Sequence, residues 1–256
     1  MALITFHTLS RPDRAAADLE RDQVHVWKAR LDIPRERLGQ LERGLTPGER
    51  ERIAGLRSEA DRRRATASRG LQRHILAGYA EEPVAGLHFT YGPAGKPEIT
   101  SQGGDGSIYF NATHSGDLLL IAVGRDSCLG IDVERVRPIP RADRVARRAF
   151  SEAERRRIEQ LPPENRAEAF ITCWTRKEAC VKAVGGGVWS AFARFEVTVE
   201  PDEPPQVVAV DGDRDAAARW SLYDLRPAPG YVGALAVRGG GWKVSGGTLD
   251  GSELQP

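Results

Sequence analysis

Two long helix-like stretches, each set among short strand-like runs, form a loose internal repeat that constrains the fold more than any other feature of the sequence. A helix is predicted over residues 58–79, because Ser58 and Asp61 have the spacing of an N-terminal capping pair. A second helix is predicted over residues 164–184, where Gly185-Gly186-Gly187 is a strong stop signal. Helices and strands mixed in two similar halves predict an α+β fold.

The boundary between the two halves is expected near residues 124–127, which gives an N-terminal half of residues 1–126 and a C-terminal half of residues 127–256. Strand-like runs lie on both sides of this boundary, at residues 24–31, 118–123, 129–133 and 231–237. The glycine-rich tail after Arg238 has little to hold it in place, and we expect no fixed structure there.

Composition narrows the class of protein. The 256 residues carry 37 Lys and Arg against 36 Asp and Glu, a balance that argues against a general nucleic-acid binder. No window reaches the apolar length of a membrane span, and the N-terminus lacks the basic start and apolar core of a signal peptide. A cytoplasmic protein without membrane or nucleic-acid partners is therefore expected. The three cysteines lack CxxC spacing, and Cys173 and Cys180, seven residues apart on one side of a predicted helix, are expected to be buried, reduced thiols.

The strongest chemical signal is the segment Gly130-Ile131-Asp132-Val133-Glu134. Side chains alternate across a strand, so Asp132 and Glu134 are predicted to share one face. Two carboxylates on one face repel each other unless solvent or a cation lies between them, and Mg²⁺ prefers such oxygen ligands. Taken alone, the pair is explained more simply by an edge strand with a solvated acidic face.

A second signal lies in the C-terminal predicted helix, where Phe170, Trp174, Glu178 and Lys182 recur every four residues and line one stripe. Glu178 would add a third carboxylate ligand for the metal ion, and Lys182 would point its own positively charged ammonium group at a phosphate. Three carboxylates and a lysine around one Mg²⁺ form a coherent phosphoryl-transfer site. The alternative is a surface Glu–Lys pair beside a buried tryptophan.

A polar loop between two strands is expected at Phe110-Asn111-Ala112-Thr113-His114-Ser115-Gly116. His114 could donate a hydrogen bond to a phosphate or act as an acid or base. A histidine in a turn, however, more often makes a structural hydrogen bond. No GxSxG frame surrounds Ser115, so a hydrolase triad is not expected. Arg64 and Lys96 are either solvent-exposed surface charges or ligands of a phosphate group.

The order and spacing of these motifs closely resemble the 4′-phosphopantetheinyl transferases, and most of all the longer, pseudo-dimeric Sfp type. The matching series is Gly95-Lys96-Pro97, Phe110-Asn111-x-Thr113-His114-Ser115-Gly116, Gly130-Ile131-Asp132-x-Glu134 and Trp174-x-x-Lys177-Glu178-Ala179-x-x-Lys182. Asp61-x-x-Arg64 and Phe150-Ser151-x-x-Glu154 also resemble segments of that family. The resemblance implies two similar α+β halves related by a pseudo-twofold axis, with a ligand cleft between them.

The same resemblance implies a holo-acyl-carrier-protein synthase type of enzyme. Such an enzyme transfers the 4′-phosphopantetheine arm of coenzyme A to a serine of an apo acyl or peptidyl carrier protein, requires Mg²⁺ and releases 3′,5′-ADP. The length of the chain implies a monomer, since the two halves would supply a cleft that shorter relatives build between chains.

Residue by residue, the resemblance implies Mg²⁺ ligands at Asp132, Glu134 and Glu178 and catalytic roles for Glu178, Lys182 and His114. It implies coenzyme A contacts from Arg52, Arg64, Lys96, Thr113, His114 and Lys182. Glu49 falls where the family has one lysine of a pair, so the residues that grip the 3′-phosphate are not settled by the motif.

Other interpretations of the same residues remain open. The three carboxylates also suit a Mg²⁺-dependent phosphohydrolase or nucleotidyl transferase, which would act without a carrier protein. The arginine-rich first helix suits a nucleic-acid module, although this leaves the carboxylates unexplained. A catalytically silent coenzyme A binder would bind its ligand and modify nothing. The segment 135–161, with arginines 137, 141, 144, 147 and 148, is either a docking surface for a carrier protein or a solvated basic helix.

Overall fold

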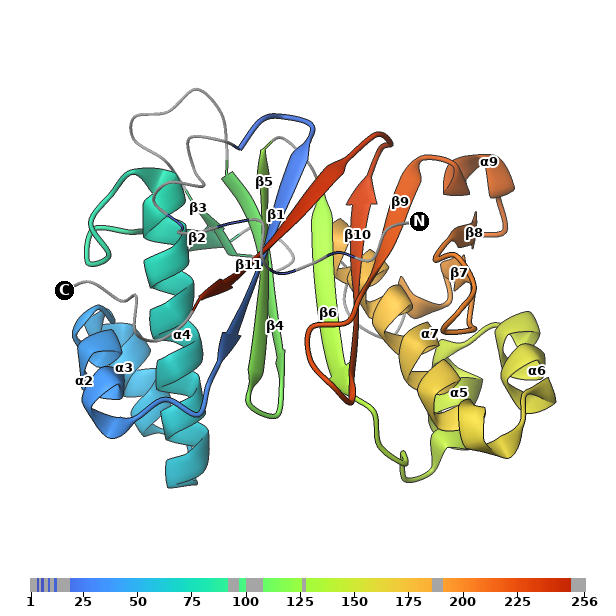
Figure 1. Ribbon diagram of the computed structural model, residues 1–256, viewed down its shortest axis with the longest axis horizontal. Coiled ribbons are helices and arrows are strands. Elements are labelled where there is room, and N and C mark those ends of the chain that lie inside the picture. The colour runs from blue at the N-terminus through green and yellow to red at the C-terminus, as the bar shows by residue number, and fades with distance from the viewer. Residues whose placement is uncertain are drawn as a thin grey trace.

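The layers of the fold run helix, sheet, sheet, helix (Figure 1). The computed structural model describes residues 19–91, 97–99, 108–125, 128–185 and 191–249, together with Ile4, Phe6, Leu9 and Pro12. The long helix α4 (Glu59–Ala80) covers the outer face of one sheet, and α7 (Pro163–Val184) covers the outer face of the other. A long helix packed on a sheet thus occurs twice, which confirms the predicted α+β fold in two halves.

The first sheet has the strand order β11-β1-β5-β4-β3-β2. Its strands are β1 (Gln23–Arg30), β2 (Phe89–Tyr91), β3 (Pro97–Ile99), β4 (Ile108–Ser115), β5 (Leu118–Arg125) and β11 (Lys243–Leu249). Beside α4 lie the shorter helices α2 (Arg35–Arg43) and α3 (Pro47–Ala54). The predicted helix start is confirmed, since the Ser58 hydroxyl accepts the backbone N–H of Asp61 at 3.0 Å.

The second sheet has the strand order β6-β10-β9 and packs against α7. Its strands are β6 (Leu129–Arg135), β9 (Trp220–Leu225) and β10 (Tyr231–Arg238). Around it lie α5 (Ala142–Ala149), α6 (Glu152–Gln160), the strand pair β7 (Phe195–Val197) and β8 (Val207–Val210), and the short α9 (Arg214–Ala217). Gly185 ends α7 in the left-handed region at φ 69°, as its position after the predicted helix indicated.

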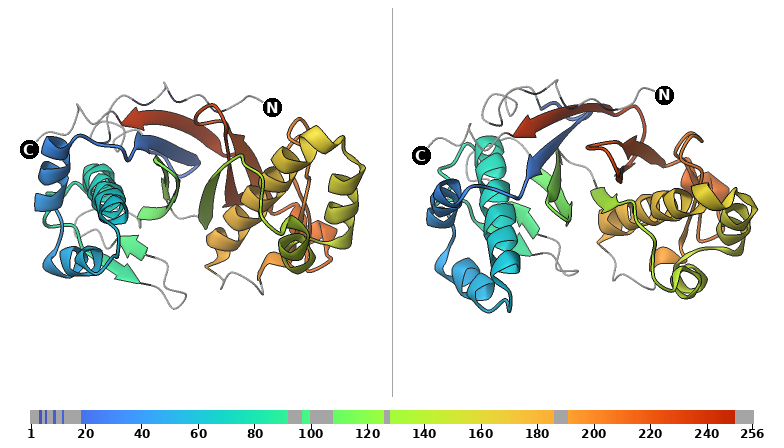
Figure 2. Two further views of the ribbon diagram at one scale, coloured as in Figure 1. Left: turned by 90° about the horizontal axis from the view of Figure 1, so that it is seen from below. Right: turned by 60° about the horizontal axis from the view of Figure 1, so that its bottom comes forward.

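The C-terminal strand β11 crosses back to the first sheet and pairs in parallel with β1 (Figure 2). The expectation that the tail after Arg238 lacks fixed structure is therefore wrong for residues 243–249. Gly247 permits this pairing, because a Cβ there would lie 2.6 Å from the Trp27 ring. Strands from both predicted halves thus build the first sheet.

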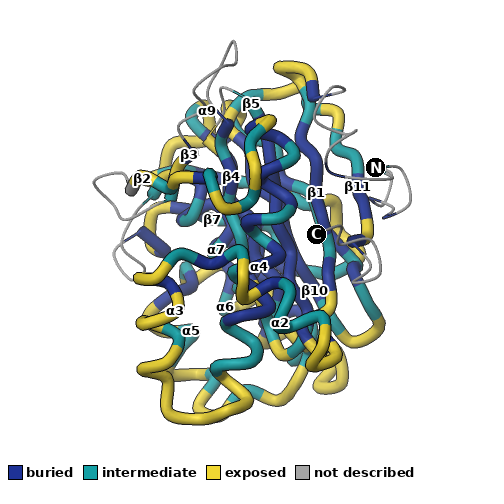
Figure 3. Tube along the Cα trace, turned by 90° about the vertical axis from the view of Figure 1, so that its left-hand side faces the viewer, coloured by how far each residue is buried: buried dark blue, intermediate teal, exposed yellow. Residues whose placement is uncertain are grey.

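Apolar side chains from both sheets form the contact between the halves. Val24, Val26 and Leu120 of the first sheet pack with Ile131 and Leu235 of the second, and all five are fully buried. The central strands are accordingly buried over most of their length, whereas several connections at the rim are exposed (Figure 3). None of the helices in the described part of the chain combines the length and apolarity that crossing a membrane requires.

Candidate functional site

The predicted metal carboxylates lie where β6 meets α7. The two elements touch at Gly130, where a Cβ would lie 2.1 Å from the Ala179 carbonyl oxygen and 2.4 Å from the Ala183 nitrogen. Ile131 and Val133 point into the apolar layer between the sheets, so Asp132 and Glu134 take the opposite face, as the alternation predicted. That face is covered by the helix that carries Glu178 and Lys182.

Lys182 lies among the carboxylates. Its Nζ donates to Asp132 Oδ1 at 2.7 Å and lies 4.0 Å from Glu178 Oε1. It also donates to Thr113 Oγ1 at 3.2 Å and to the Ile131 carbonyl oxygen at 3.3 Å. The four-residue spacing of Glu178 and Lys182 therefore places both on the α7 stripe that faces β6, and the surface-pair alternative does not describe them.

Two carboxylate oxygens of this cluster are buried with no hydrogen-bond partner among the described residues: Asp132 Oδ2 and Glu178 Oε2. Burial raises the pKa of Asp132 to about 7, because Lys182 only partly offsets the loss of hydration and the charges of Glu178 and Glu134 raise this pKa further. Burial also raises the pKa of Glu178, again against the effect of Lys182. The cluster is therefore short of positive charge.

A hard divalent cation would supply that charge and fits the oxygen donors present. In the described part of the chain, no three His, Cys, Asp or Glu side chains are already arranged as a metal site, and the Lys182 ammonium lies beside Asp132. The fit to a cation rests on the two unpartnered oxygens and on the raised pKa of Asp132.

The expectation of a polar loop over residues 110–116 is wrong for residues 110–115, because they belong to strand β4. This strand presents a row of polar side chains to β6. Ile108 and Phe110 pack toward α4, so Asn111, Thr113 and Ser115 take the other face. The Thr113 hydroxyl donates to Asp132 Oδ1 at 3.0 Å, and the Ser115 hydroxyl donates to Glu134 Oε2 at 2.7 Å. Sequence reasoning assigned no role to Asn111 or Ser115, although their alternation with Thr113 along one strand was a usable signal.

His114 takes the α4 side of the same strand. It borders a surface pocket of about 490 Å³ between α3 and α4, whose cationic lining residues are Arg52, Arg64 and Arg69. Although His114 stays accessible to solvent, the protein around it displaces enough water to lower its pKa. The positive charges of Lys182 and Arg64 lower this pKa further and outweigh Glu134.

The structure brings together three of the residues expected to grip a nucleotide. Arg52 and Arg64 line the pocket with His114, and Arg64 Nε donates to Asp117 Oδ1 at 2.9 Å. Thr113 lies apart from them, on the β6 side of β4. Lys96 falls outside the described residues.

Glu49, which stands at a position where a lysine was expected, is a structural residue. Its carboxylate caps α3 by accepting the Thr46 N–H at 2.8 Å, and it pairs with Arg69 Nε at 2.5 Å. It lies 5% exposed, so its charge is neutralised inside the protein. Arg69 is consequently a basic residue of this pocket that the motif analysis did not single out.

Lys177 differs from its neighbour Glu178, because it points away from the carboxylate cluster. Its buried Nζ donates to both oxygens of Glu154, at 2.7 and 3.0 Å, and to the Phe195 carbonyl oxygen. Glu154 in turn forms the predicted capping box with Ser151. These two motif residues hold α6 and β7 against α7 and contact neither Asp132 nor Glu134.

Two family models match the chain, and together they span most of the described structure. The 4′-phosphopantetheinyl transferase superfamily matches residues 128–236, which include the carboxylate cluster. The 4′-phosphopantetheinyl transferase, N-terminal family matches residues 34–125, which include the cationic pocket.

Individual relatives agree with this assignment. The 4′-phosphopantetheinyl transferase HetI of Nostoc sp. is 35% identical over 222 residues, which cover 87% of this chain and 90% of HetI. AcpT of Salmonella typhimurium, also a 4′-phosphopantetheinyl transferase, is 33% identical over 49% of this chain and 66% of its own. The L-aminoadipate-semialdehyde dehydrogenase-phosphopantetheinyl transferase of Xenopus laevis is 30% identical over 62% of this chain and 55% of its own. The chain is therefore a transferase that belongs to the 4′-phosphopantetheinyl transferase superfamily.

Proposed function

We propose that this protein transfers the 4′-phosphopantetheine arm of coenzyme A to a serine of an apo carrier protein, with Mg²⁺, and releases 3′,5′-ADP. The observation that carries the proposal is the buried cluster of Asp132, Glu178 and Lys182, which has two unpartnered carboxylate oxygens. A site for phosphoryl transfer needs negative oxygen ligands for a cation and a positive group for the phosphate. This cluster offers both on one side of α7.

Asp132, Glu134 and Glu178 would hold the metal ion. Bound Mg²⁺ supplies charge neutralisation at the pyrophosphate of coenzyme A. Lys182 then keeps its ammonium beside the same carboxylates, from where it can bind a phosphate oxygen. Glu178 is also the proposed general base, because it is a carboxylate that lies beside Lys182 in the same cluster.

The proposed chemical step is an in-line displacement at the β-phosphorus of coenzyme A. The carrier serine Oγ forms the new P–O bond, and its proton passes to the Glu178 carboxylate, directly or through a water. The bond from the β-phosphorus to the bridging oxygen breaks, and 3′,5′-ADP leaves with that oxygen. Lys182 stabilises the negative charge that develops on the departing phosphate.

The nucleotide end of coenzyme A is assigned to the pocket between α3 and α4. Arg52, Arg64 and His114 line it, and arginine suits a phosphate because its planar guanidinium can donate two parallel hydrogen bonds. His114 and Thr113 are consecutive on β4, so the pocket and the carboxylate cluster lie on opposite faces of one strand. A ligand that extends across this strand would reach both, as coenzyme A must.

The experiment that tests the function is the intact mass of an apo acyl-carrier protein after incubation with this protein, coenzyme A and Mg²⁺. We expect a gain of one phosphopantetheine, which EDTA prevents. Asp132→Ala and Glu178→Ala should abolish the gain while the protein remains folded by circular dichroism. The matched control is Glu164→Ala, which removes an exposed carboxylate from the same helix as Glu178 and should transfer normally.

Each outcome decides between the alternatives. Normal transfer by Asp132→Ala or Glu178→Ala would overturn the assignment of the metal ligands. Release of phosphate or nucleotide without any carrier protein would favour a hydrolase or nucleotidyl transferase. Coenzyme A binding without modification of any of several carriers would favour a silent binder.

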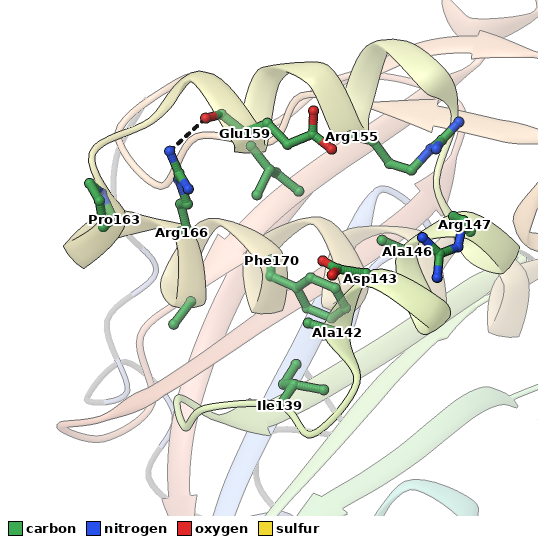
Figure 4. Close-up of a pocket in the computed structure, with 12 residues that line it drawn as sticks. Ile139, Ala142, Asp143, Ala146, Arg147, Arg155, Glu159, Pro163, Arg166 and Phe170 are labelled. Atoms are coloured by element: carbon green, nitrogen blue, oxygen red, sulfur yellow. Dashed lines mark hydrogen bonds between the residues drawn. The ribbon is translucent and has the colours of Figure 1, made fainter.

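The carrier protein is proposed to dock around α5, which follows β6 directly. Arg144 and Arg147 are exposed on this helix, and beside it lies a pocket of about 520 Å³ between α5, α6 and α7 (Figure 4). Ile139 and Phe170 give the pocket an apolar lining, and its three arginines outnumber its two acidic residues, Asp143 and Glu159. It therefore suits an acidic helix that also presents an apolar side chain.

Charge reversal tests this surface. Arg144→Glu combined with Arg147→Glu should raise the KM for the carrier protein and leave the KM for coenzyme A unchanged. The matched control is Arg156→Glu, an exposed arginine of α6 that does not line this pocket. Equal effects of both changes would mean that general charge, and not this surface, attracts the carrier.

The enzyme is also proposed to act as a monomer, because one chain provides both the cationic pocket and the carboxylate cluster. Light scattering of the purified protein tests this, and a stable dimer under assay conditions would contradict it.

A further inference from the structure

Three polar side chains of β4, from Asn111, Thr113 and Ser115, lie along one edge of β6 at every second residue. Strand β6 pairs with β10 along one edge, while at its other edge the N–H of Ile131 donates to Asn111 Oδ1 at 2.9 Å and that of Arg135 donates to Ser115 Oγ at 3.2 Å. Backbone N–H groups at the edge of a sheet need acceptors when no neighbouring strand supplies them. Side chains of β4 therefore take the place of a neighbouring strand along this edge.

The same row controls the direction of two hydroxyl protons. Thr113 Oγ1 accepts from Lys182 Nζ at 3.2 Å and donates to Asp132 Oδ1 at 3.0 Å. Ser115 Oγ accepts the Arg135 N–H and donates to Glu134 Oε2 at 2.7 Å. Because each hydroxyl has a donor on its acceptor side, its single proton is directed at the carboxylate.

These hydrogen bonds leave the carboxylates half engaged. Asp132 has Thr113 and Lys182 on Oδ1, and its Oδ2 is buried without a partner among the described residues. Ser115 likewise engages one oxygen of Glu134. A carboxylate held at one oxygen cannot rotate freely, so the position of its second oxygen is set before any cation arrives.

We propose that Ser115 and Thr113 are positioning residues of the metal centre, whose hydroxyls hold Glu134 and Asp132 so that one oxygen of each remains for the cation. This inference rests on the proposed function, since it assumes that these carboxylates bind a metal ion. In this inference, Thr113 orients Asp132 through the hydrogen bonds that it makes with Asp132 and Lys182. Loss of such outer hydrogen bonds typically weakens metal binding by about 10- to 100-fold.

The test is a titration with Mn²⁺ of the full chain saturated with coenzyme A, with free Mn²⁺ measured by electron paramagnetic resonance. We expect Ser115→Ala to weaken Mn²⁺ binding by about tenfold or more, and Ser115→Thr, which keeps the hydroxyl, to restore most of it. The matched control is Ser221→Ala on β9, which removes a hydroxyl that donates to the Gly239 carbonyl oxygen at 2.7 Å, a hydrogen bond of the same length. It should leave the affinity for Mn²⁺ unchanged.

The failure of this inference is distinguishable from the failure of the proposed function. Equal Mn²⁺ affinity in wild type and Ser115→Ala would overturn the positioning role and leave the function standing. No Mn²⁺ binding by the wild-type protein with coenzyme A would overturn both. If thermal denaturation shows that Ser115→Ala is unfolded, Thr113→Val and Thr113→Ser decide in its place: weaker Mn²⁺ binding by the valine variant alone supports the inference, and equal binding overturns it.

Discussion

The buried ion pair of Lys177 and Glu154 gives the sharpest prediction about stability. Both side chains are 1% exposed, and Lys177 Nζ contacts the two Glu154 oxygens at 2.7 and 3.0 Å. Lys177→Met removes the only lysine on this carboxylate among the described residues and leaves it two backbone donors, Ser151 N–H and Val197 N–H. Breaking a buried ion pair on one side costs about 3–5 kcal/mol.

We therefore expect Lys177→Met to lower the free energy of unfolding by about 3–5 kcal/mol. A change of about 1 kcal/mol moves the Tm of a chain of this size by about 2–4 °C, so the Tm should fall by roughly 10 °C. Thermal and urea unfolding, followed by tryptophan fluorescence, measure both quantities. The matched control is Lys243→Met, which breaks an exposed pair with Asp22 and should change the free energy of unfolding far less, because solvent screens exposed pairs.

The loss of stability caused by Lys177→Met should also depend on pH. Burial already raises the pKa of Glu154 although Lys177 opposes this, and removal of Lys177 raises it further. An acid whose pKa is raised in the folded state destabilises that state as the pH rises through the folded pKa, because the buried carboxylate must then ionise. The difference in Tm between wild type and Lys177→Met should accordingly grow as the pH rises above the folded pKa of Glu154 in the wild type.

A double variant completes the reasoning. Lys177→Met with Glu154→Leu removes both charges and should recover most of the loss, apart from about 1 kcal/mol for the lost capping box of α6. If Lys177→Met is as stable as Lys243→Met, or if the double variant is no better than the single one, the ion pair is not what holds α6 and β7 against α7.

Three further predictions concern other parts of the molecule. Gly130→Ala should cost about 1–3 kcal/mol or more in urea unfolding, because its Cβ would lie 2.1 Å from the Ala179 carbonyl oxygen; Gly240→Ala, where no atom lies within 4 Å, is the control. The Thr46 N–H and the charge of Arg69 outweigh burial and lower the pKa of Glu49 below 4.5, so its contribution is present at neutral pH and lost as the pH falls through the folded pKa. Acid unfolding should therefore be shallower in Glu49→Gln, and an unchanged profile would contradict this. Arg52→Ala should raise the KM for coenzyme A several-fold with little change in kcat, and an unchanged KM would remove Arg52 from the nucleotide pocket.

Local features of the structure were the ones open to prediction. The caps at Ser58 and Ser151 and the end of α7 at Gly185 are confirmed, because each depends on residues within one helical turn. The shared face of Asp132 and Glu134 is confirmed for the same reason, since it follows from the two-residue period of a strand. The carboxylate cluster could be assembled from such local rules together with the order of the motifs.

Partners distant in the sequence were not predictable in this way. Strand β11 was expected to lack structure, because its glycines give a weak signal, yet β1 has an edge that its backbone can join in parallel. The roles of Asn111 and Ser115 depend on β6 lying beside β4, about 20 residues further along the chain, and a backbone pattern does not state which strand lies next to which.

By itself, the sequence determined which side chains share a helix stripe or a strand face, because these follow from the 3.6- and two-residue periods of the backbone. Only the tertiary structure decided what those faces meet. Lys177 and Lys182 belong to one motif on one helix, yet five residues turn the helix by about 140° relative to a full turn, which aims one lysine at Glu154 and the other at Asp132. Their different environments arise from packing between elements far apart in the chain, and packing, not spacing, separates the structural lysine from the one in the carboxylate cluster.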